Sequence, residues 1–139
     1  MARTLFVCRQ NAGRSQMSQA LFEQAAHGKQ EALSAGTHPA ERVHPEVVTV
    51  MHELGIDIAN RKPQLLTPEL AQSADVVVTM GCGDECPVIP GKRYIDWDLP
   101  DPEGRSLDEV RAIRDEIDAR VRSLLRDLDS SGVSDSHAP

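Results

Sequence analysis

Short apolar runs alternate along this chain with stretches that carry helix signals. The runs are compact and rich in aliphatic residues, as buried parallel strands are; they cover residues 4–7, 31–35, 74–79 and 93–95. Apolar spacing and start signals predict helices in between and afterwards; these cover about 15–27, 45–54, 67–70 and 106 onward. Strands that alternate with helices form βαβ units. The pattern therefore predicts an α/β fold whose parallel sheet is covered by helices on both faces.

Two of the predicted helices have a distinct apolar face. The helix predicted over 45–54 begins at Pro45, a residue suited to the first helical turn, and is closed by Gly55. Its inner face is expected to be Val47, Val48, Met51 and Leu54. The last helix opens with a capping box from Ser106 to Glu109. Its apolar stripe is Leu107, Val110, Ile113, Ile117, Val121, Leu124 and Leu128.

Length and composition fit one domain. The chain has 139 residues, 40% of them hydrophobic, and contains only one Trp, one Tyr and two Phe. A core of Val, Ile, Leu, Ala and Met is therefore expected. We predict a single domain over residues 1–129 and a polar, disordered tail over residues 130–139.

Charge and hydropathy narrow the possible partners. The formal net charge is −7 and no block of Lys or Arg stands out, which gives nucleic-acid binding little support. No stretch is long and apolar enough for a membrane span, and the N-terminus lacks the apolar segment of a signal peptide. These features predict a cytoplasmic protein without a membrane partner. Its three cysteines are then expected to be reduced, catalytic or redox-active rather than a fixed disulfide framework.

The most informative segment lies between the first predicted strand and the first predicted helix, from Cys8 to Ser15. Backbone N–H groups in such a loop, and at the helix start, converge on an anion. Arg14 can clamp two oxygens with its planar guanidinium. A thiolate at Cys8 could then attack a tetrahedral oxyanion. The predicted oxyanion-binding residues are Arg9, Gln10, Asn11, Ala12, Gly13, Arg14 and Ser15.

Each of these residues also has a purely structural interpretation. Cys8 could be a buried, inert side chain, and Ser15 could be a helix cap rather than a hydrogen-bond donor to the thiolate. Asn11 tolerates left-handed backbone, and Gly13 permits close approach to a ligand. The Cys-x5-Arg spacing is a weak signal alone, but the preceding strand and following helix favour a reactive thiolate.

The loop, with Gln16-Met17 after it, resembles the low-molecular-weight protein tyrosine phosphatase family, and in particular its arsenate reductase branch. The likeness covers about residues 3–128; its further matches are Ser34-Ala35-Gly36, Gly55-Ile56-Asp57-Ile58, 74–79 and Asp101-Pro102. The resemblance implies a four-stranded parallel sheet flanked by helices on both faces. We expect no cofactor and no metal site.

The resemblance also implies roles for three residues. Cys8 would be the nucleophile, Arg14 the oxyanion clamp and Asp101 the general acid. A carboxylic acid suits the last role because cleavage of a bond to phosphorus or arsenic leaves an alkoxide or hydroxide that needs a proton. The structural alternative is that Asp101-Pro102 only forms a turn, as this pair often does.

The other two cysteines favour a reductase over a phosphatase. Hydrolysis of a phosphocysteine needs one thiol, whereas reduction of arsenate needs two further electrons. Cys82 and Cys86 follow a strand that should end beside Cys8. We expect Cys82 to attack the Cys8–arsenic adduct and Cys86 to resolve the resulting disulfide, which leaves Cys82–Cys86 for reduction. The alternative is a phosphotyrosine-type phosphatase that uses Cys8 and Asp101.

Arsenate, or phosphate or sulfate as its analogue, is the expected ligand, and thioredoxin is the expected reductant. A low-molecular-weight thiol with a glutaredoxin-like protein is the other possible donor, and the order of Cys82 and Cys86 is open. Related enzymes can bind potassium through acidic side chains, but the matching positions here are Gln19 and Gln64. Glu103 stands where phosphatases of the family often carry an aromatic residue, which argues against an aryl phosphate substrate.

Two other functions compete with the enzyme. Cys82 and Cys86 have a spacing found in structural zinc sites, but the five histidines are scattered and two more ligands are missing. The second competing function is a module that binds an anion without turning it over. Such a module would need only Gly or Ser, not a cysteine, at the centre of the loop.

Overall fold

The computed structural model describes residues 2–81 and 91–137, with side chains described up to residue 129. Eight helices and strands occur in these ranges. Their order is β1 (Arg3–Cys8), α1 (Arg14–Ala26), β2 (Glu31–Gly36), α2 (Pro45–His52), α3 (Pro68–Ser73), β3 (Val76–Thr79), β4 (Arg93–Asp96) and α4 (Leu107–His137). The predicted alternation of strands and helices is confirmed.

The four strands form one parallel sheet in the order β2-β1-β3-β4. The register aligns Cys8 with Gly36 of β2, and Val7 with Thr79 of β3. Thr79 in turn pairs with Asp96 of β4. All four strands therefore end at one edge of the sheet, the edge at which parallel α/β proteins bind their ligands.

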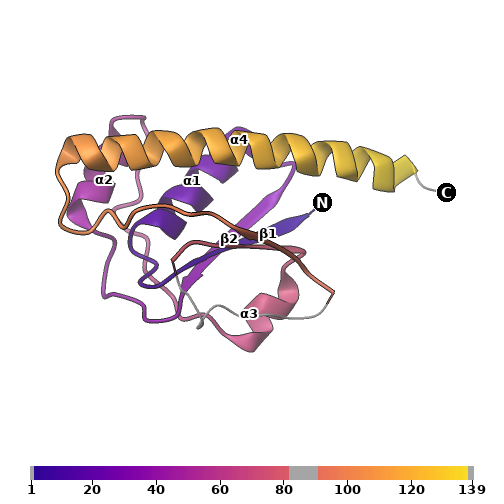
Figure 1. Ribbon diagram of the computed structural model, residues 1–139, viewed down its shortest axis with the longest axis horizontal. Helices are drawn as coiled ribbons and strands as arrows, with labels where there is room; N and C mark the ends of the chain where they lie inside the picture. Colours follow the sequence, from indigo (N-terminus) through magenta and orange to yellow (C-terminus); the bar gives the residue numbers. More distant parts are fainter. Residues whose placement is uncertain (1, 82–90, 138–139) are drawn as a thin grey trace.

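Helices cover both faces of the sheet, as predicted. Helices α1, α2 and α4 lie on one side and α3 on the other (Figure 1). Successive residues of β1 point to opposite faces: Phe6 packs with Phe22 and Trp97 on the α1 side, whereas Leu5 and Val7 join the α3 cluster. This packing fixes the direction in which β1 delivers Cys8 to the edge.

The predicted helix faces are largely confirmed, with two corrections. Leu54 is 43% exposed because α2 ends at His52 and the chain has left the helix before it. Leu107, the first residue of α4, is 40% exposed; it has no preceding helical turn to cover it. The rest of the α4 stripe is buried, and on α2 Val50 is fully buried while Val48 is only partly so.

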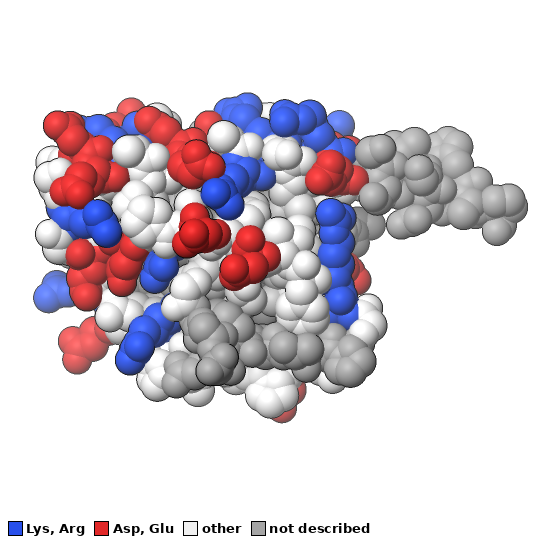
Figure 2. Space-filling model, in the orientation of Figure 1, with Lys and Arg blue, Asp and Glu red and all other residues white. Residues whose placement is uncertain are grey.

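Helix α4 continues to His137 in the structure, so it enters the segment for which the sequence predicts a tail. Figure 1 shows it as a single long rod across the α1 and α2 side of the molecule. No helix within 2–81 and 91–137 is long and apolar enough to cross a membrane. On the face drawn in Figure 2, Lys and Arg are interspersed with Asp and Glu.

Candidate active site

The connection between β1 and α1 forms a tight loop at the carboxyl edge of the sheet. Cys8 is the last residue of β1, Arg14 is the first of α1, and only five residues join them. Cys8 is a free cysteine with 2% of its surface exposed. Its side chain therefore lies at the bottom of the loop, where the sequence predicted it.

Backbone carbonyls of this loop point outward, to the chain that follows β2. Four of them accept hydrogen bonds: Thr37 N–H to Cys8 O (3.3 Å), His38 N–H to Arg9 O (2.7 Å), Ala40 N–H to Gln10 O (3.0 Å) and His44 N–H to Ala12 O (2.9 Å). In a trans peptide unit the C=O and the next N–H point in opposite directions. The N–H groups after these carbonyls therefore turn inward, which is the arrangement of an anion-binding nest.

Asn11 organises the interior of the loop. It is fully buried with a left-handed φ of 52°, a conformation that Asn tolerates better than most residues. Its backbone N–H points at Cys8 Sγ (3.3 Å), and its Nδ2 donates to Ser15 Oγ (2.7 Å). Ser15 Oγ also lies 2.9 Å from Cys8 Sγ, within hydrogen-bond distance. The Asn11 N–H and the Ser15 hydroxyl therefore both contact the sulfur.

A neighbouring segment locks Asn11 in place. Asn11 Oδ1 accepts hydrogen bonds from the backbone N–H of Gln64 (2.9 Å) and from Gln16 Nε2 (3.2 Å). The Gln64 carbonyl in turn accepts the N–H of Gly36. The sequence analysis placed Gln64 only at a position matched to a potassium ligand, and its hydrogen bond to Asn11 was not predicted.

Two glycines allow the surrounding chain to approach the loop. A Cβ on Gly13 would lie 2.7 Å from Pro102 Cγ, and a Cβ on Gly36 would lie 2.7 Å from the Arg9 carbonyl oxygen. Real Cβ atoms do not approach other atoms this closely. Gly13 is predicted to let the backbone approach a ligand; within the described chain the side chain that lies against it is that of Pro102.

Arg14 is buried with part of its hydrogen-bonding capacity unused. It is 8% exposed, and its Nη1 donates to the carbonyl oxygen of Leu99 (3.2 Å). Gly81, with φ of 86°, lies against the guanidinium so closely that a Cβ there would clash with it. Arg14 Nε is buried and has no hydrogen-bond partner in the described part of the protein. An unpaired buried donor costs about 1–3 kcal/mol, which a bound oxyanion would recover.

Asp101 faces Arg14 from the segment after β4. Its Oδ2 lies 3.7 Å from Arg14 Nη2, and its side chain is 51% exposed. Its Oδ1 accepts a hydrogen bond from the backbone N–H of Glu103 (3.0 Å). Asp101 therefore also forms a turn, which the sequence analysis gave as the alternative to a general acid. The structure therefore brings three predicted residues, Cys8, Arg14 and Asp101, to one edge of the sheet.

Cys82 and Cys86 lie outside the described residues. The described chain reaches Gly81, which touches Arg14 and directly precedes Cys82 in the sequence. In the ranges 2–81 and 91–137 no group of three or more His, Cys, Asp or Glu side chains could hold a metal ion.

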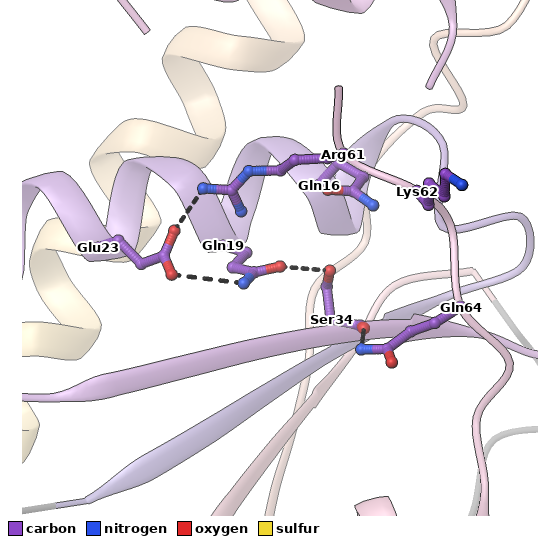
Figure 3. Close-up of a pocket in the computed structure, with 7 residues that line it drawn as sticks. All are labelled: Gln16, Gln19, Glu23, Ser34, Arg61, Lys62 and Gln64. Atoms are coloured by element: carbon purple, nitrogen blue, oxygen red, sulfur yellow. Dashed lines mark hydrogen bonds and ion pairs between the residues drawn. The ribbon is translucent and has the colours of Figure 1, made fainter. Parts of the chain in front are cut away.

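A polar pocket of about 360 Å³ lies beside the loop, between α1, β2 and the 61–64 segment (Figure 3). It contains Gln19 and Gln64, the positions matched to a potassium site. Ser34 Oγ donates to Gln19 Oε1 (2.6 Å), and Gln64 Nε2 donates to the Ser34 carbonyl oxygen (2.7 Å). Arg61 and Glu23, an ion pair at 2.7 Å, also line the pocket. Gln19 Oε1 and the Ser34 carbonyl oxygen already accept hydrogen bonds, and neither Gln19 nor Gln64 carries the charge of an acidic potassium ligand.

Comparisons with known proteins agree with this geometry. The family model for low molecular weight phosphotyrosine protein phosphatases matches residues 3–134. A putative arsenate reductase from Halobacterium salinarum is 44% identical over 86% of this chain and 87% of its own length. A glutaredoxin arsenate reductase from Synechocystis is 34% identical over 90% of this chain and 97% of its own.

A solved structure extends the comparison to three dimensions. The thioredoxin-dependent arsenate reductase from Corynebacterium glutamicum superimposes with a TM-score of 0.83 at 41% identity, over 94% of this chain. This chain spans 63% of the length of that protein. The resemblance predicted from the Cys8–Ser15 loop is confirmed: the chain belongs to the low molecular weight phosphotyrosine protein phosphatase family.

Proposed function

We propose that this protein is an arsenate reductase that binds arsenate in the Cys8–Ser15 loop. One observation carries the proposal: Cys8 Sγ meets Asn11 N–H and Ser15 Oγ at the bottom of a loop whose carbonyls point outward, which turns its N–H groups inward. Arg14 Nε, which has no hydrogen-bond partner among the described residues, supplies a further donor for an oxyanion. Similarity to arsenate reductases over most of the chain supports the choice of substrate.

The first step joins sulfur to arsenic. The Cys8 thiolate attacks arsenate, an As–O bond breaks, and the departing hydroxyl takes a proton from Asp101 and leaves as water. Inward N–H groups and Arg14 stabilise the charge on the remaining oxygens. The position of Asp101 Oδ2, 3.7 Å from Arg14 Nη2, supports its role as the proton donor.

The second step transfers two electrons. A thiolate of Cys82 attacks the Cys8 sulfur, the S–As bond breaks with its electron pair going to arsenic, and arsenite leaves. Cys86 then displaces Cys8 from the Cys8–Cys82 disulfide. The Cys82–Cys86 disulfide that remains is reduced by an external dithiol. Two facts support this relay: Gly81 lies against Arg14, and Cys82 is the next residue in the sequence.

Thioredoxin is the reductant that we propose. The relative from Corynebacterium is thioredoxin-dependent, whereas the one from Synechocystis is a glutaredoxin arsenate reductase. The paired thiols of this chain favour the former, because a dithiol donor exchanges directly with a protein disulfide. The proposed relay starts with all three cysteines reduced, which needs a reducing compartment, so we propose a cytoplasmic location.

The test follows arsenate-dependent consumption of NADPH with thioredoxin and thioredoxin reductase. We expect multiple turnover in the wild type and none in Cys8→Ser. Cys82→Ser and Cys86→Ser should stop after at most one equivalent of arsenite, because Cys8 can still form the adduct. Equal turnover in all three variants would exclude the relay.

A phosphatase is the second candidate, since the same loop serves a phosphoryl group equally well and the family model is that of phosphatases. This alternative requires Cys8 and Asp101 but not Cys82. Hydrolysis of 4-nitrophenyl phosphate at a rate that Cys82→Ser leaves intact, without arsenate-dependent NADPH oxidation, would favour it over the reductase.

A further inference from the structure

The direction of the Asp101 side chain depends mainly on how the backbone of its segment is fixed. Its carboxylate is half exposed, with one oxygen in the local turn to Glu103 N–H and the other 3.7 Å from Arg14. Among the described residues, the last backbone hydrogen bond that ties the chain to the sheet before this segment runs from Trp97 N–H to the Thr79 carbonyl oxygen. The direction of the Asp101 carboxylate thus depends on what fixes the backbone of residues 101–105.

Arg105 closes this segment on itself. Its Nε donates to the backbone carbonyl oxygen of Asp101 at 2.6 Å. Its backbone N–H donates to the Pro102 carbonyl oxygen at 3.2 Å, across a turn in which Gly104 adopts a φ of 73°. A hydrogen bond from a charged guanidinium is stronger than one between neutral groups, so the Asp101 peptide has one strong external partner.

The first turn of α4 holds Arg105 in place. Glu109 Oε2 pairs with Arg105 Nη1 at 3.1 Å, while its Oε1 accepts the N–H and the hydroxyl of Ser106. Hydrogen bonds from Ser106, assisted by Arg105, lower the pKa of Glu109 below its ordinary value. One turn later, Val110 and Ile113 are buried in the core. The guanidinium is therefore tied to a rigid element.

We propose that Arg105 is a positioning residue: it ties the Asp101 peptide to α4 and so aims the Asp101 carboxylate at Arg14 and the oxyanion. This inference rests on the proposed function, in which Asp101 donates the proton of the first step. Among the described residues the hydrogen bonds of Arg105 go to Asp101, Pro102 and Glu109. Its effect is on orientation, and an error of about 1 Å in a reacting group can cost up to ~10²-fold in rate.

The test compares Arg105→Ala with Arg120→Ala. Arg120 also forms an i,i+4 ion pair, with Glu116 at 2.8 Å, but within α4 and well after the 101–105 segment in the sequence. We expect Arg105→Ala to lower kcat for arsenate about tenfold and to change KM less than about twofold. Arg120→Ala should match the wild type, and neither change should shift Tm much, because exposed ion pairs contribute little stability. Arg105→Lys should restore part of the rate, since an ammonium can also donate to the Asp101 carbonyl.

A double-mutant cycle separates positioning from a general structural role. If Arg105 acts through Asp101, then Arg105→Ala has no further effect in an Asp101→Asn background. Additive losses would overturn the inference while leaving the proposed acid intact. Wild-type rates in Asp101→Asn would remove Asp101 from the mechanism, and the role of Arg105 with it.

Hydrogen exchange tests the same contact without turnover. The Glu103 amide, which donates to Asp101 Oδ1, should exchange faster in Arg105→Ala than in the wild type or in Arg120→Ala. Unchanged exchange would overturn the inference even if arsenate is not the substrate. Faster exchange in a protein that does not reduce arsenate would support the tie between Arg105 and Asp101 and contradict the proposed function alone.

Discussion

Asn11 shows how much of the site one residue can determine. Its backbone N–H and its side chain serve different partners: the former points at Cys8 Sγ, the latter joins Ser15 to Gln64. All of this takes place at a φ of 52°. A residue at this position must therefore supply a left-handed backbone and both a donor and an acceptor.

Two substitutions separate these requirements. Asn11→Gly keeps the left-handed conformation and the backbone N–H but removes the amide, whereas Asn11→Ala also strains the backbone by about 1–2 kcal/mol. We expect both to lower the rate of adduct formation, because Ser15 Oγ loses its donor and Gln64 N–H its acceptor. Asn11→Ala should have the lower free energy of unfolding in urea, by about 1 kcal/mol or more. Equal stability would show that the loop backbone is not held at its left-handed angle.

Secondary structure was the most predictable feature of the molecule, because each element carries its own signal. Apolar runs marked all four strands, and the Ser106–Glu109 capping box marked the start of α4. One error fell at a helix end, at Leu54, and another within α2, where Val50 is buried and the predicted Val48 only partly so. The hydrophobic periodicity of a segment does not show which of its residues a neighbouring element covers.

A cluster of charged residues joins the end of α2 to α4, and the hydrophobic periodicity of the sequence does not indicate it. Glu53, which follows α2, accepts hydrogen bonds from Arg111 (2.7 Å) and Arg114 (2.9 Å), and Arg114 also donates to the Val50 carbonyl. The hydrogen bond from Arg111 is the main cause that lowers the pKa of Glu53 from 4.5 to about 2, with Arg114 contributing. The ionised carboxylate is therefore the form that the fold prefers.

This cluster makes stability depend on pH in acid. A carboxyl whose pKa is lower in the folded protein stabilises it above the ordinary pKa, and this contribution is lost as pH falls through the folded value. We expect Glu53→Gln to unfold at lower urea concentration than the wild type at pH 7. The difference should shrink between about pH 4.5 and 2. Glu116→Gln, which breaks a pair within α4 alone, is the control; a constant difference for Glu53→Gln would contradict the role of its charge.

At the scale of the whole molecule, the site is a meeting of segments distant in sequence. Arg14 donates to Leu99 across 85 positions and packs against Gly81. That Cys8 and Arg14 share one edge of the sheet was predictable from their short motif, and the place of Asp101 beside them from the family resemblance. Leu99 and Gly81 were not, since they contribute a carbonyl oxygen and an absent side chain, neither of which a sequence pattern marks.

The proposed anion site lies in a protein whose formal net charge is −7. Attraction must therefore come from local donors, which are the inward N–H groups and the guanidinium of Arg14; its Nε is buried and has no hydrogen-bond partner in the described part of the chain. A ligand that satisfies these groups only in the folded state stabilises the fold by about 2.7 kcal/mol at 100 times its Kd. Arsenate and phosphate should therefore raise Tm in proportion to the logarithm of their concentration, and Cys8→Ser, which keeps the loop donors, should respond in the same way. Arg14→Lys, which cannot reproduce the planar fork, should show a much smaller rise. A response in Arg14→Lys equal to that of the wild type would place the anion elsewhere on the protein, whereas its selective loss would tie anion binding to the junction of β1 and α1.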